Sequence, residues 1–182
     1  MAKFVVGITG KIGSGKSIIS WYLHKEYQFT EYRFSQILSD ILERLHLKKS
    51  RENFQKLGVS LRREWPGVIV DSLEKDIREN GAELVVIDGI RYENEMKMLR
   101  KFSHNLLISV EAPAELRYQR CKERGEKGED KISFEEFLAS EKKETETKIE
   151  KISQLADYHI ENKGDKEELF RKVDEIIEKE MA

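Results

Sequence analysis

The sequence has few of the features that would place it in a membrane or outside the cell. Its 182 residues include one cysteine, Cys121, so no disulfide can form within the chain, and a reducing compartment fits this composition. No apolar run approaches the roughly 18 residues that a membrane-spanning helix needs, and no signal-peptide pattern precedes the first predicted strand. We therefore expect a soluble, cytoplasmic protein with no membrane partner.

A strong net charge is also missing. The chain has 33 Lys and Arg against 35 Asp and Glu, which gives a formal net charge of −2. Binding to nucleic acid depends largely on neutralising phosphates, so this balance offers no overall electrostatic basis for a DNA or RNA partner. The length and the 38% hydrophobic composition are typical of a globular chain of about one domain, residues 1–182.

Metal-ligand spacing is absent among the histidines. The four of them are scattered along the chain, so we expect structural or exposed roles for His24, His46, His104 and His159.

The first pattern that points to chemistry lies near the start of the chain. A β-branched and aromatic run stops at glycines, and Gly10-x-x-x-x-Gly15-Lys16-Ser17 then leads into residues 18–23, which have helical apolar spacing. Glycines allow backbone N–H groups to surround an anion, and the next helix begins with its positive end beside that anion. The pattern predicts a phosphate-binding loop; the alternative is an ordinary glycine-rich turn.

In such a loop, Lys16 would reach the β- and γ-phosphates of a nucleotide, and the Ser17 hydroxyl would hold Mg²⁺. The residues expected to surround the nucleotide phosphates are Gly10, Lys11, Ile12, Gly13, Ser14, Gly15, Lys16, Ser17 and Ile18.

The second pattern is the apolar run 84–87, which ends in Asp88-Gly89-Ile90-Arg91. A continuous run of this kind is typical of a strand buried on both faces. An acidic residue at the carboxyl end of such a strand completes the Mg²⁺ site of P-loop proteins, so Asp88 is the expected partner of Ser17. Parallel sheets bind ligands at this edge, which also places Arg91 in the cleft. The alternative is a helix-capping Asp and a surface Arg.

Strand and helix patterns alternate along the whole chain, which predicts an α/β fold with a parallel sheet and right-handed crossovers. Besides the two strands above, the expected strands are 29–34, 106–110 and 157–161. The expected helices follow the phosphate loop to about residue 27 and then cover 35–47, a segment ended by Pro66-Gly67, 68–80, a segment after Pro113, 134–152 and a closing segment after residue 165.

Two stretches stand out by charge. Between residues 44 and 63 the only acid is Glu52, against the cations Arg44, Lys48, Lys49, Arg51, Lys56, Arg62 and Arg63. This run predicts a docking site for an anion, with a solvated helical face as the alternative. Farther along, one helical face carries Arg117, Arg120 and Arg124, and the polar, glycine-containing stretch 125–131 follows it as a mobile loop would.

These stretches together resemble P-loop kinases of the nucleoside monophosphate kinase group. The chain is most similar to adenylate-kinase-related and deoxynucleoside-monophosphate-kinase-like proteins, and more distantly to dephospho-coenzyme A kinase. The similarity covers nearly the full length and rests on 7–17, 34–36, 51–53, 61–64, 86–91, 112–125 and 156–164.

The resemblance implies a P-loop three-layer fold, in which helices on both faces enclose five parallel strands in the order 2-3-1-4-5. It also implies an acceptor-binding segment over 35–80 and a lid over 125–133. Roles follow for Arg91 on the acceptor phosphate, Arg120 against the ATP base, Arg124 on the transferring phosphates, and the turn containing Asn162 and Gly164 beside the adenine.

The sequence departs from that family in two places. The acceptor-binding helix of adenylate kinases begins Thr-Gly-Asp-x-x-x-Arg, but here Ser39 stands where the Arg would be. Other residues must then bind the acceptor's phosphate. The candidate substrate-binding residues are Ser35, Gln36, Arg62, Arg63 and Arg91. A further lid arginine is also missing, with Lys142 and Lys143 as possible substitutes; lysine provides a point charge in place of a bidentate fork.

The activity that the resemblance implies is a nucleotide kinase that transfers the γ-phosphoryl group of Mg-ATP to a nucleoside or deoxynucleoside monophosphate. Because the transition state is loose, catalysis is mostly positioning and charge neutralisation, by Lys16, Asp88 through Mg²⁺, Arg91 and Arg124.

Two other activities stay open. A dephospho-coenzyme A kinase-like enzyme would phosphorylate a hydroxyl and benefit from a carboxylate base, but Gln36 stands at that position, leaving Asp40 or Asp88. A partner-regulated ATPase or switch would hydrolyse ATP without a small acceptor.

Overall fold

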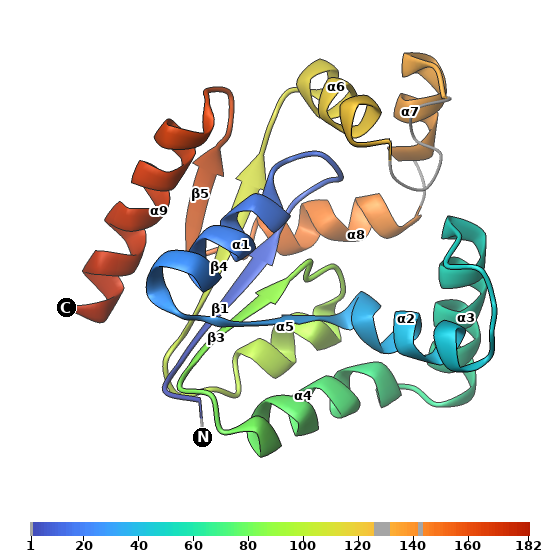
Figure 1. Cartoon of the computed structure of the whole chain (residues 1–182), viewed down its shortest axis with the longest axis horizontal. Helices are drawn as coiled ribbons and strands as arrows, with labels where there is room; N and C mark the ends of the chain where they lie inside the picture. The colour runs from blue at the N-terminus through green and yellow to red at the C-terminus, as the bar shows by residue number, and fades with distance from the viewer. Residues whose placement is uncertain (1, 126–131, 142–143) are drawn as a thin grey trace.

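The computed structural model describes residues 2–125, 132–141 and 144–182 (Figure 1). Most of the lid predicted at 125–133, together with Lys142 and Lys143, lies outside these ranges. The sheet has five parallel strands in the order β2-β3-β1-β4-β5, which confirms the predicted order. The strands are β1 Phe4–Thr9, β2 Thr30–Arg33, β3 Leu84–Asp88, β4 Asn105–Glu111 and β5 Tyr158–Glu161.

Helices connect the strands and cover the sheet. Their bounds are α1 Lys16–Tyr27, α2 Phe34–Arg44, α3 Arg51–Glu64, α4 Val68–Asn80, α5 Glu93–Leu99, α6 Ala114–Arg124, α7 Phe134–Glu141, α8 Glu144–Ser153 and α9 Lys166–Met181. Among the described residues, no helix has both the length and the apolarity needed to cross a membrane.

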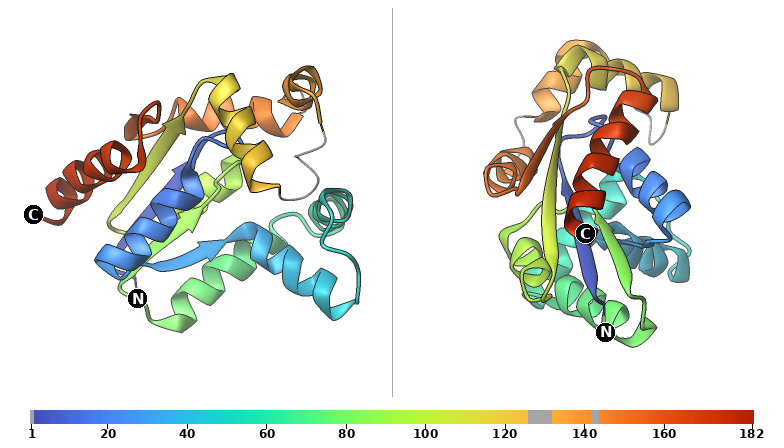
Figure 2. Two further views of the ribbon diagram at one scale, coloured as in Figure 1. Left: turned by 45° about the horizontal axis from the view of Figure 1, so that its top comes forward. Right: turned by 90° about the vertical axis from the view of Figure 1, so that its left-hand side faces the viewer.

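The sheet is apolar on both faces, as its continuous hydrophobic strands predict. In β1, Val5 packs with buried side chains from α2, α4, α5 and α8, whereas Val6 packs with those from α1 and α9. The two views in Figure 2 show the sheet between these helix layers.

Two helices differ from the sequence-based expectation. The predicted helix 35–47 is α2, which ends at Arg44, so the predicted end is three residues too late, and Leu45, just after the helix, is 57% exposed. The helix α5 was not predicted at all. It buries Met98 and Leu99, so an apolar spacing was present, but a segment of seven residues is too short for a clear helical period.

The remaining predicted helix, 134–152, corresponds to α7 and α8, which lie on either side of residues 142–143. The predicted strands match β1 to β5 within one or two residues at their ends.

The strand register brings the carboxyl ends of the central strands to one edge. Ile8 of β1 pairs with Asp88 of β3, and Asp88 also pairs with Arg33 of β2. The loop after β1 and the segment after β3 therefore emerge side by side at this edge.

Candidate functional site

The loop between β1 and α1 has the backbone that the glycine pattern predicts. Gly13 and Gly15 have positive φ angles of 75° and 108°. A Cβ atom at Gly13 would lie 2.5 Å from the Arg117 carbonyl oxygen, and one at Gly15 would lie 2.3 Å from the Asn162 side chain. Only glycine fits at both positions, so the loop keeps its curved path around a small central space.

Side chains from the other half of the chain hold this loop in place. The Asn162 amide, which is buried, donates to the Ser14 carbonyl oxygen at 2.8 Å. The Arg120 guanidinium donates to the Asn162 side-chain oxygen at 3.2 Å, and that of Arg117 donates to the Ile12 carbonyl at 3.4 Å. Arg120 and Asn162, both predicted to lie near the ATP base, are thus brought together beside the loop.

Arg117, which was predicted to share a face with Arg120 and Arg124, has a different environment. It is buried, forms a bidentate ion pair with Glu141 of α7, and donates through Nε to the Ala112 carbonyl. Arg124 is the last residue of α6 and is exposed, and Gly164 is exposed in the turn after β5.

The helix α1 begins in a way that suits an anion. Its N-cap is Gly15, with no side chain capping the first N–H groups. The Lys16 ammonium donates to the Lys11 carbonyl oxygen at 2.9 Å, so it lies across the loop, and its side chain is buried. A helix start without a side-chain cap, the helix dipole and an adjacent ammonium together suit phosphate oxygens.

Ser17 and Asp88, the residues expected to hold Mg²⁺, meet at the edge of the sheet. The Ser17 hydroxyl donates to Asp88 Oδ2 at 2.9 Å, whereas Asp88 Oδ1 is buried and accepts no hydrogen bond from the described residues. A buried carboxylate oxygen without a donor is costly unless a cation or another polar group satisfies it. The hydroxyl and carboxylate oxygens are hard ligands of the kind that Mg²⁺ prefers.

The turn from Asp88 to Arg91 is held by Glu95, a residue that the sequence reasoning missed. The Glu95 carboxylate is 2% exposed and accepts hydrogen bonds from the backbone N–H groups of Arg91, at 2.8 Å, and Tyr92, at 3.2 Å. Burial raises the pKa of Glu95, and these two hydrogen bonds and the Arg62 charge oppose the shift. The signal in the sequence was a glutamate three residues after the N-cap of a short helix.

The candidate acceptor-binding arginines differ in position. Arg91 is exposed at the start of the segment that Glu95 holds. The Arg62 guanidinium of α3 lies 3.6 Å from Glu95 Oε1 and 4.4 Å from the centre of the Tyr92 ring, so it reaches back to the same segment. Arg63, with a 75% exposed side chain, pairs only with the adjacent Glu64 among the described residues, so the structure does not bring it to the site.

The rest of the basic stretch 44–63 is mostly a solvated surface. Lys49 pairs with Glu43 and Lys56 pairs with Glu52, all four on exposed side chains. Pairs of this kind contribute little stability.

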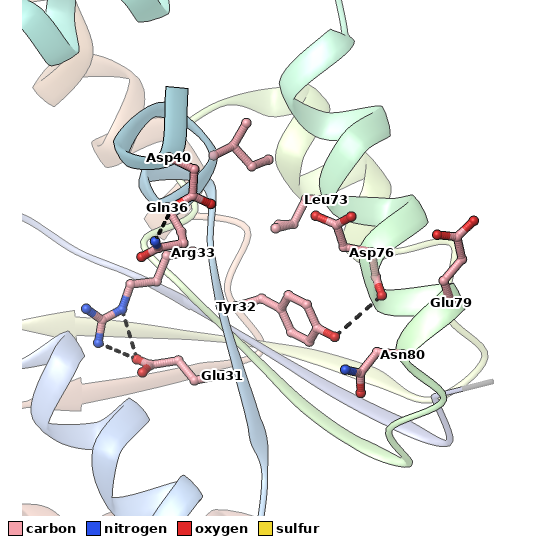
Figure 3. Close-up of a pocket in the computed structure, with 10 residues that line it drawn as sticks. Glu31, Tyr32, Arg33, Gln36, Asp40, Leu73, Asp76, Glu79 and Asn80 are labelled. Atoms are coloured by element: carbon pink, nitrogen blue, oxygen red, sulfur yellow. Dashed lines mark hydrogen bonds and ion pairs between the residues drawn. The ribbon is translucent and has the colours of Figure 1, made fainter. Parts of the chain in front are cut away.

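A groove of about 630 Å³ lies along β2, between α2 and α4 (Figure 3). Its lining is rich in carboxylates: Glu31, Asp40, Asp76 and Glu79. Gln36, a predicted substrate-binding residue, also lines it and donates to Asp40 at 2.6 Å, while Ser35 is exposed beside it at the start of α2. Arg33 also lines the groove, but four carboxylates against this one arginine disfavour an anionic ligand, so the groove is a poor place for an acceptor's phosphate.

The part of the chain that the structure describes contains no group of three or more His, Cys, Asp or Glu side chains arranged to hold a metal ion. A divalent cation at Ser17 and Asp88 would therefore need phosphate or water oxygens as its remaining ligands, which is how Mg²⁺ usually binds beside a nucleotide.

Residues 6–148 match the family described as the AAA domain. A UPF0200 protein of Thermococcus onnurineus is 30% identical over 98% of this chain and 98% of its own length. The chain belongs to the UPF0200 family of P-loop proteins. A P-loop domain of this kind binds nucleotides, so the phosphate site on α1 agrees with the family.

Solved structures with a similar fold include small-molecule kinases. The shikimate kinase of Aquifex aeolicus superposes with a TM-score of 0.60 at 18% identity over 96% of each chain. The dephospho-CoA kinase of Campylobacter jejuni gives 0.57 at 18% identity over 98% of each chain. At this identity the likeness concerns the fold, and it shows that the UPF0200 chain has a kinase-like P-loop architecture.

Proposed function

We propose that this UPF0200 protein is a nucleotide kinase that transfers the γ-phosphoryl group of Mg-ATP to a nucleoside or deoxynucleoside monophosphate. The observation that carries the proposal is the contact between Ser17 and Asp88 at 2.9 Å, with a second, buried Asp88 oxygen that has no hydrogen-bond partner among the described residues. This contact joins the phosphate loop to the strand end from which Arg91 emerges. Donor and acceptor phosphates can thus meet at one point.

Each group on the nucleotide side has a specific role in this proposal. Ser17 and Asp88 would hold Mg²⁺, which would neutralise charge on the phosphates. Lys16 would exchange the Lys11 carbonyl for the β- and γ-phosphates, and the uncapped N–H groups of α1 would bind the same oxygens. Arg120 and Asn162 would fix the loop beside the base, and Arg124 would approach the transferring group.

On the acceptor side, Arg91 and Arg62 would bind the phosphate of the monophosphate. Glu95 links the two, because it accepts from the Arg91 backbone N–H and lies 3.6 Å from the Arg62 guanidinium. A phosphate acceptor is largely ionised at neutral pH and needs no general base. The cations need only hold the ATP and acceptor phosphates in line while the γ-phosphoryl group passes from one to the other.

The geometry favours a phosphate acceptor over a hydroxyl acceptor. Asp40, one of the two candidate bases for a hydroxyl, accepts a 2.6 Å hydrogen bond from Gln36 in the acidic groove along β2. Asp88, the other, already accepts from Ser17. In this proposal Asp88 holds Mg²⁺ and Asp40 lies in the acidic groove with Gln36, so neither carboxylate serves as the base that a hydroxyl acceptor would use.

A transfer screen tests the proposal. The protein is incubated with Mg-ATP and each ribo- and deoxynucleoside monophosphate, dephospho-coenzyme A and shikimate, with Lys16→Ala and the exposed α1 variant Lys25→Ala as controls. We expect at least one monophosphate to be phosphorylated faster than ATP is hydrolysed, and Lys16→Ala to lose about 100-fold or more in kcat.

Transfer to dephospho-coenzyme A or shikimate alone would show a hydroxyl kinase. Hydrolysis that no acceptor changes would favour a partner-regulated ATPase.

A further inference from the structure

A buried ion pair lies beside the phosphate loop, and the proposed phosphoryl transfer does not use it. The side chains of Arg117 in α6 and Glu141 at the end of α7 are 6% and 10% exposed. The contact is bidentate, with Arg117 Nη2 donating to Glu141 Oε2 at 3.1 Å. Because taking two charges out of water is costly, well-packed apolar side chains can replace such a pair without loss of stability. Stability alone is therefore a weak reason for this pair.

Arg117 contacts the middle of the phosphate loop with both its side chain and its backbone. Its Nη1 atom donates to the Ile12 carbonyl oxygen at 3.4 Å. At the next residue of the loop, a Cβ atom on Gly13 would lie 2.9 Å from the Arg117 Cα atom and 2.5 Å from the Arg117 carbonyl oxygen. The backbone of α6 thus packs directly against the loop, and one residue of α6 supports both Ile12 and Gly13.

The orientation of the Arg117 guanidinium is fixed from two directions. Its Nε atom donates to the Ala112 carbonyl oxygen at 2.9 Å, which ties it to the turn between β4 and α6. Glu141 accepts from the two terminal nitrogens. A planar guanidinium that is held at Nε and at both terminal nitrogens has little rotational freedom, so its direction toward the loop is set.

The helix α7 is also held against α6 by contacts that do not involve the ion pair. The Tyr118 hydroxyl donates to the Ile132 carbonyl oxygen at 2.9 Å, and the Tyr118 ring centre lies 5.4 Å from that of Phe134 and 5.6 Å from that of Phe137. Figure 1 shows the two helices beside each other. We therefore expect α7 to stay on α6 when the ion pair is replaced.

We propose that Arg117, held by Glu141, is a positioning residue for the ATP phosphates, because it keeps Ile12 and Gly13 in the path that surrounds the anion. Arg117 acts through the loop backbone and does not itself bind phosphate. Since Glu141 cancels its charge, the pair contributes by geometry. This inference rests on the ATP-binding half of the proposed function and is independent of the acceptor.

Replacing both members of the pair separates geometry from charge and from stability. The double variant Arg117→Met/Glu141→Leu leaves the net charge unchanged and puts apolar side chains in the buried space. Calorimetry measures its affinity for a non-hydrolysable ATP analogue with Mg²⁺, and thermal unfolding without nucleotide measures its stability. The single variants are Glu141→Gln and Arg117→Lys.

The matched control is the double variant Arg100→Met/Asp157→Asn. It also leaves the net charge unchanged, and it removes a bidentate pair at the amino end of β5, whereas the phosphate loop follows the carboxyl end of β1 in the same parallel sheet. Asparagine keeps an oxygen that can accept from the Leu107 N–H, as Asp157 does.

We expect Arg117→Met/Glu141→Leu to bind the analogue about tenfold more weakly than the wild type, because the loop loses the hydrogen bond that supports Ile12. Its unfolding temperature should stay within about 4 °C of the wild type. Glu141→Gln and Arg117→Lys should each weaken binding about threefold or more, because neither keeps the bidentate contact. The control should bind within about twofold of the wild type.

Wild-type affinity in Arg117→Met/Glu141→Leu would overturn the inference, because the pair would then be structural only. Tighter binding in Glu141→Gln would also overturn it, because the carboxylate would then act through its charge. If the double variant does not fold, the two single variants decide by the same comparison with the wild type.

Failure of the inference and failure of the proposed function give different results. Wild-type protein that binds no analogue would overturn both. Wild-type binding with unchanged affinity in the variants would overturn only the role of Arg117. Weakened binding in the variants supports that role even if no monophosphate is phosphorylated in the transfer screen.

Discussion

At the scale of single residues, Glu95 links two segments of the candidate site, the turn after β3 and helix α3. Its carboxylate is buried, accepts from the Arg91 and Tyr92 backbone, and lies 3.6 Å from Arg62. Removing one partner from such a group leaves the others unsatisfied. We therefore regard Glu95 as a positioning residue for two of the candidate acceptor-binding arginines.

Because Glu95 is buried, its contribution to the stability of the fold depends on pH. Its folded-state pKa is raised above the ordinary 4.5, so the folded protein holds this proton more tightly than the unfolded chain. Its contribution to stability is complete below about pH 4.5 and is lost as the pH rises through the raised pKa. Thermal unfolding at a series of pH values should show Glu95→Gln gaining stability relative to the wild type over that rise.

The exposed Glu93 of the same helix provides a control of opposite sign. A hydrogen bond from Lys97 lowers the pKa of Glu93, so its contribution is present above the unfolded-state pKa and lost as the pH falls. Glu93→Gln should therefore lose stability relative to the wild type as the pH rises. If the stability difference between Glu95→Gln and the wild type does not vary with pH, the raised pKa of the buried Glu95 carboxyl is contradicted.

At the scale of elements, α1 is fixed to α9 through one carboxylate. Asp174 of α9 accepts from the Tyr22 hydroxyl at 2.8 Å and from the Tyr27 hydroxyl at 2.8 Å, and the Tyr22 ring stacks on Phe170. Burial, followed by the Asp174 hydrogen bond, raises the pKa of Tyr22 to about 12. The helix that begins at the phosphate loop is thereby held from its far end.

This contact predicts a loss of stability in alkaline solution. Because the folded-state pKa of Tyr22 exceeds the ordinary 10.0, its contribution is complete below pH 10 and is lost as the pH rises toward 12. Tyr22→Phe, which keeps the ring contact, should cost about 1 kcal/mol near neutral pH. Asp174→Asn should lower the pKa of both tyrosines in an ultraviolet titration of phenolate, whereas the control Glu175→Gln should leave both unchanged. The same tyrosine pKa values in Asp174→Asn and the wild type would contradict the contact.

The elements also show what the sequence could predict. The phosphate loop and the buried strands were predicted because their signals are local: glycine spacing, then continuous apolar runs. Glu95 was missed because its significance is not local. It matters only once a seven-residue helix turns its carboxylate back onto the Arg91 backbone.

At the scale of the whole molecule, a nearly neutral chain separates its charges. The net charge is −2, yet Lys16 and Arg91 follow the carboxyl ends of β1 and β3, while four carboxylates line the groove along β2. Cations that follow the strand ends suit the phosphates that the proposed function places there. This placement agrees with the kinase-like fold of the family and with an acceptor that is itself an anion.

The central claim is that a phosphoryl group passes from ATP to another phosphate, and the chemical form of the product tests it directly. Phosphorus NMR of a reaction containing Mg-ATP and the preferred monophosphate should show a new nucleoside diphosphate, with two coupled phosphorus signals, forming in step with ADP. A new single ester signal, or inorganic phosphate with no new diphosphate, would contradict the account.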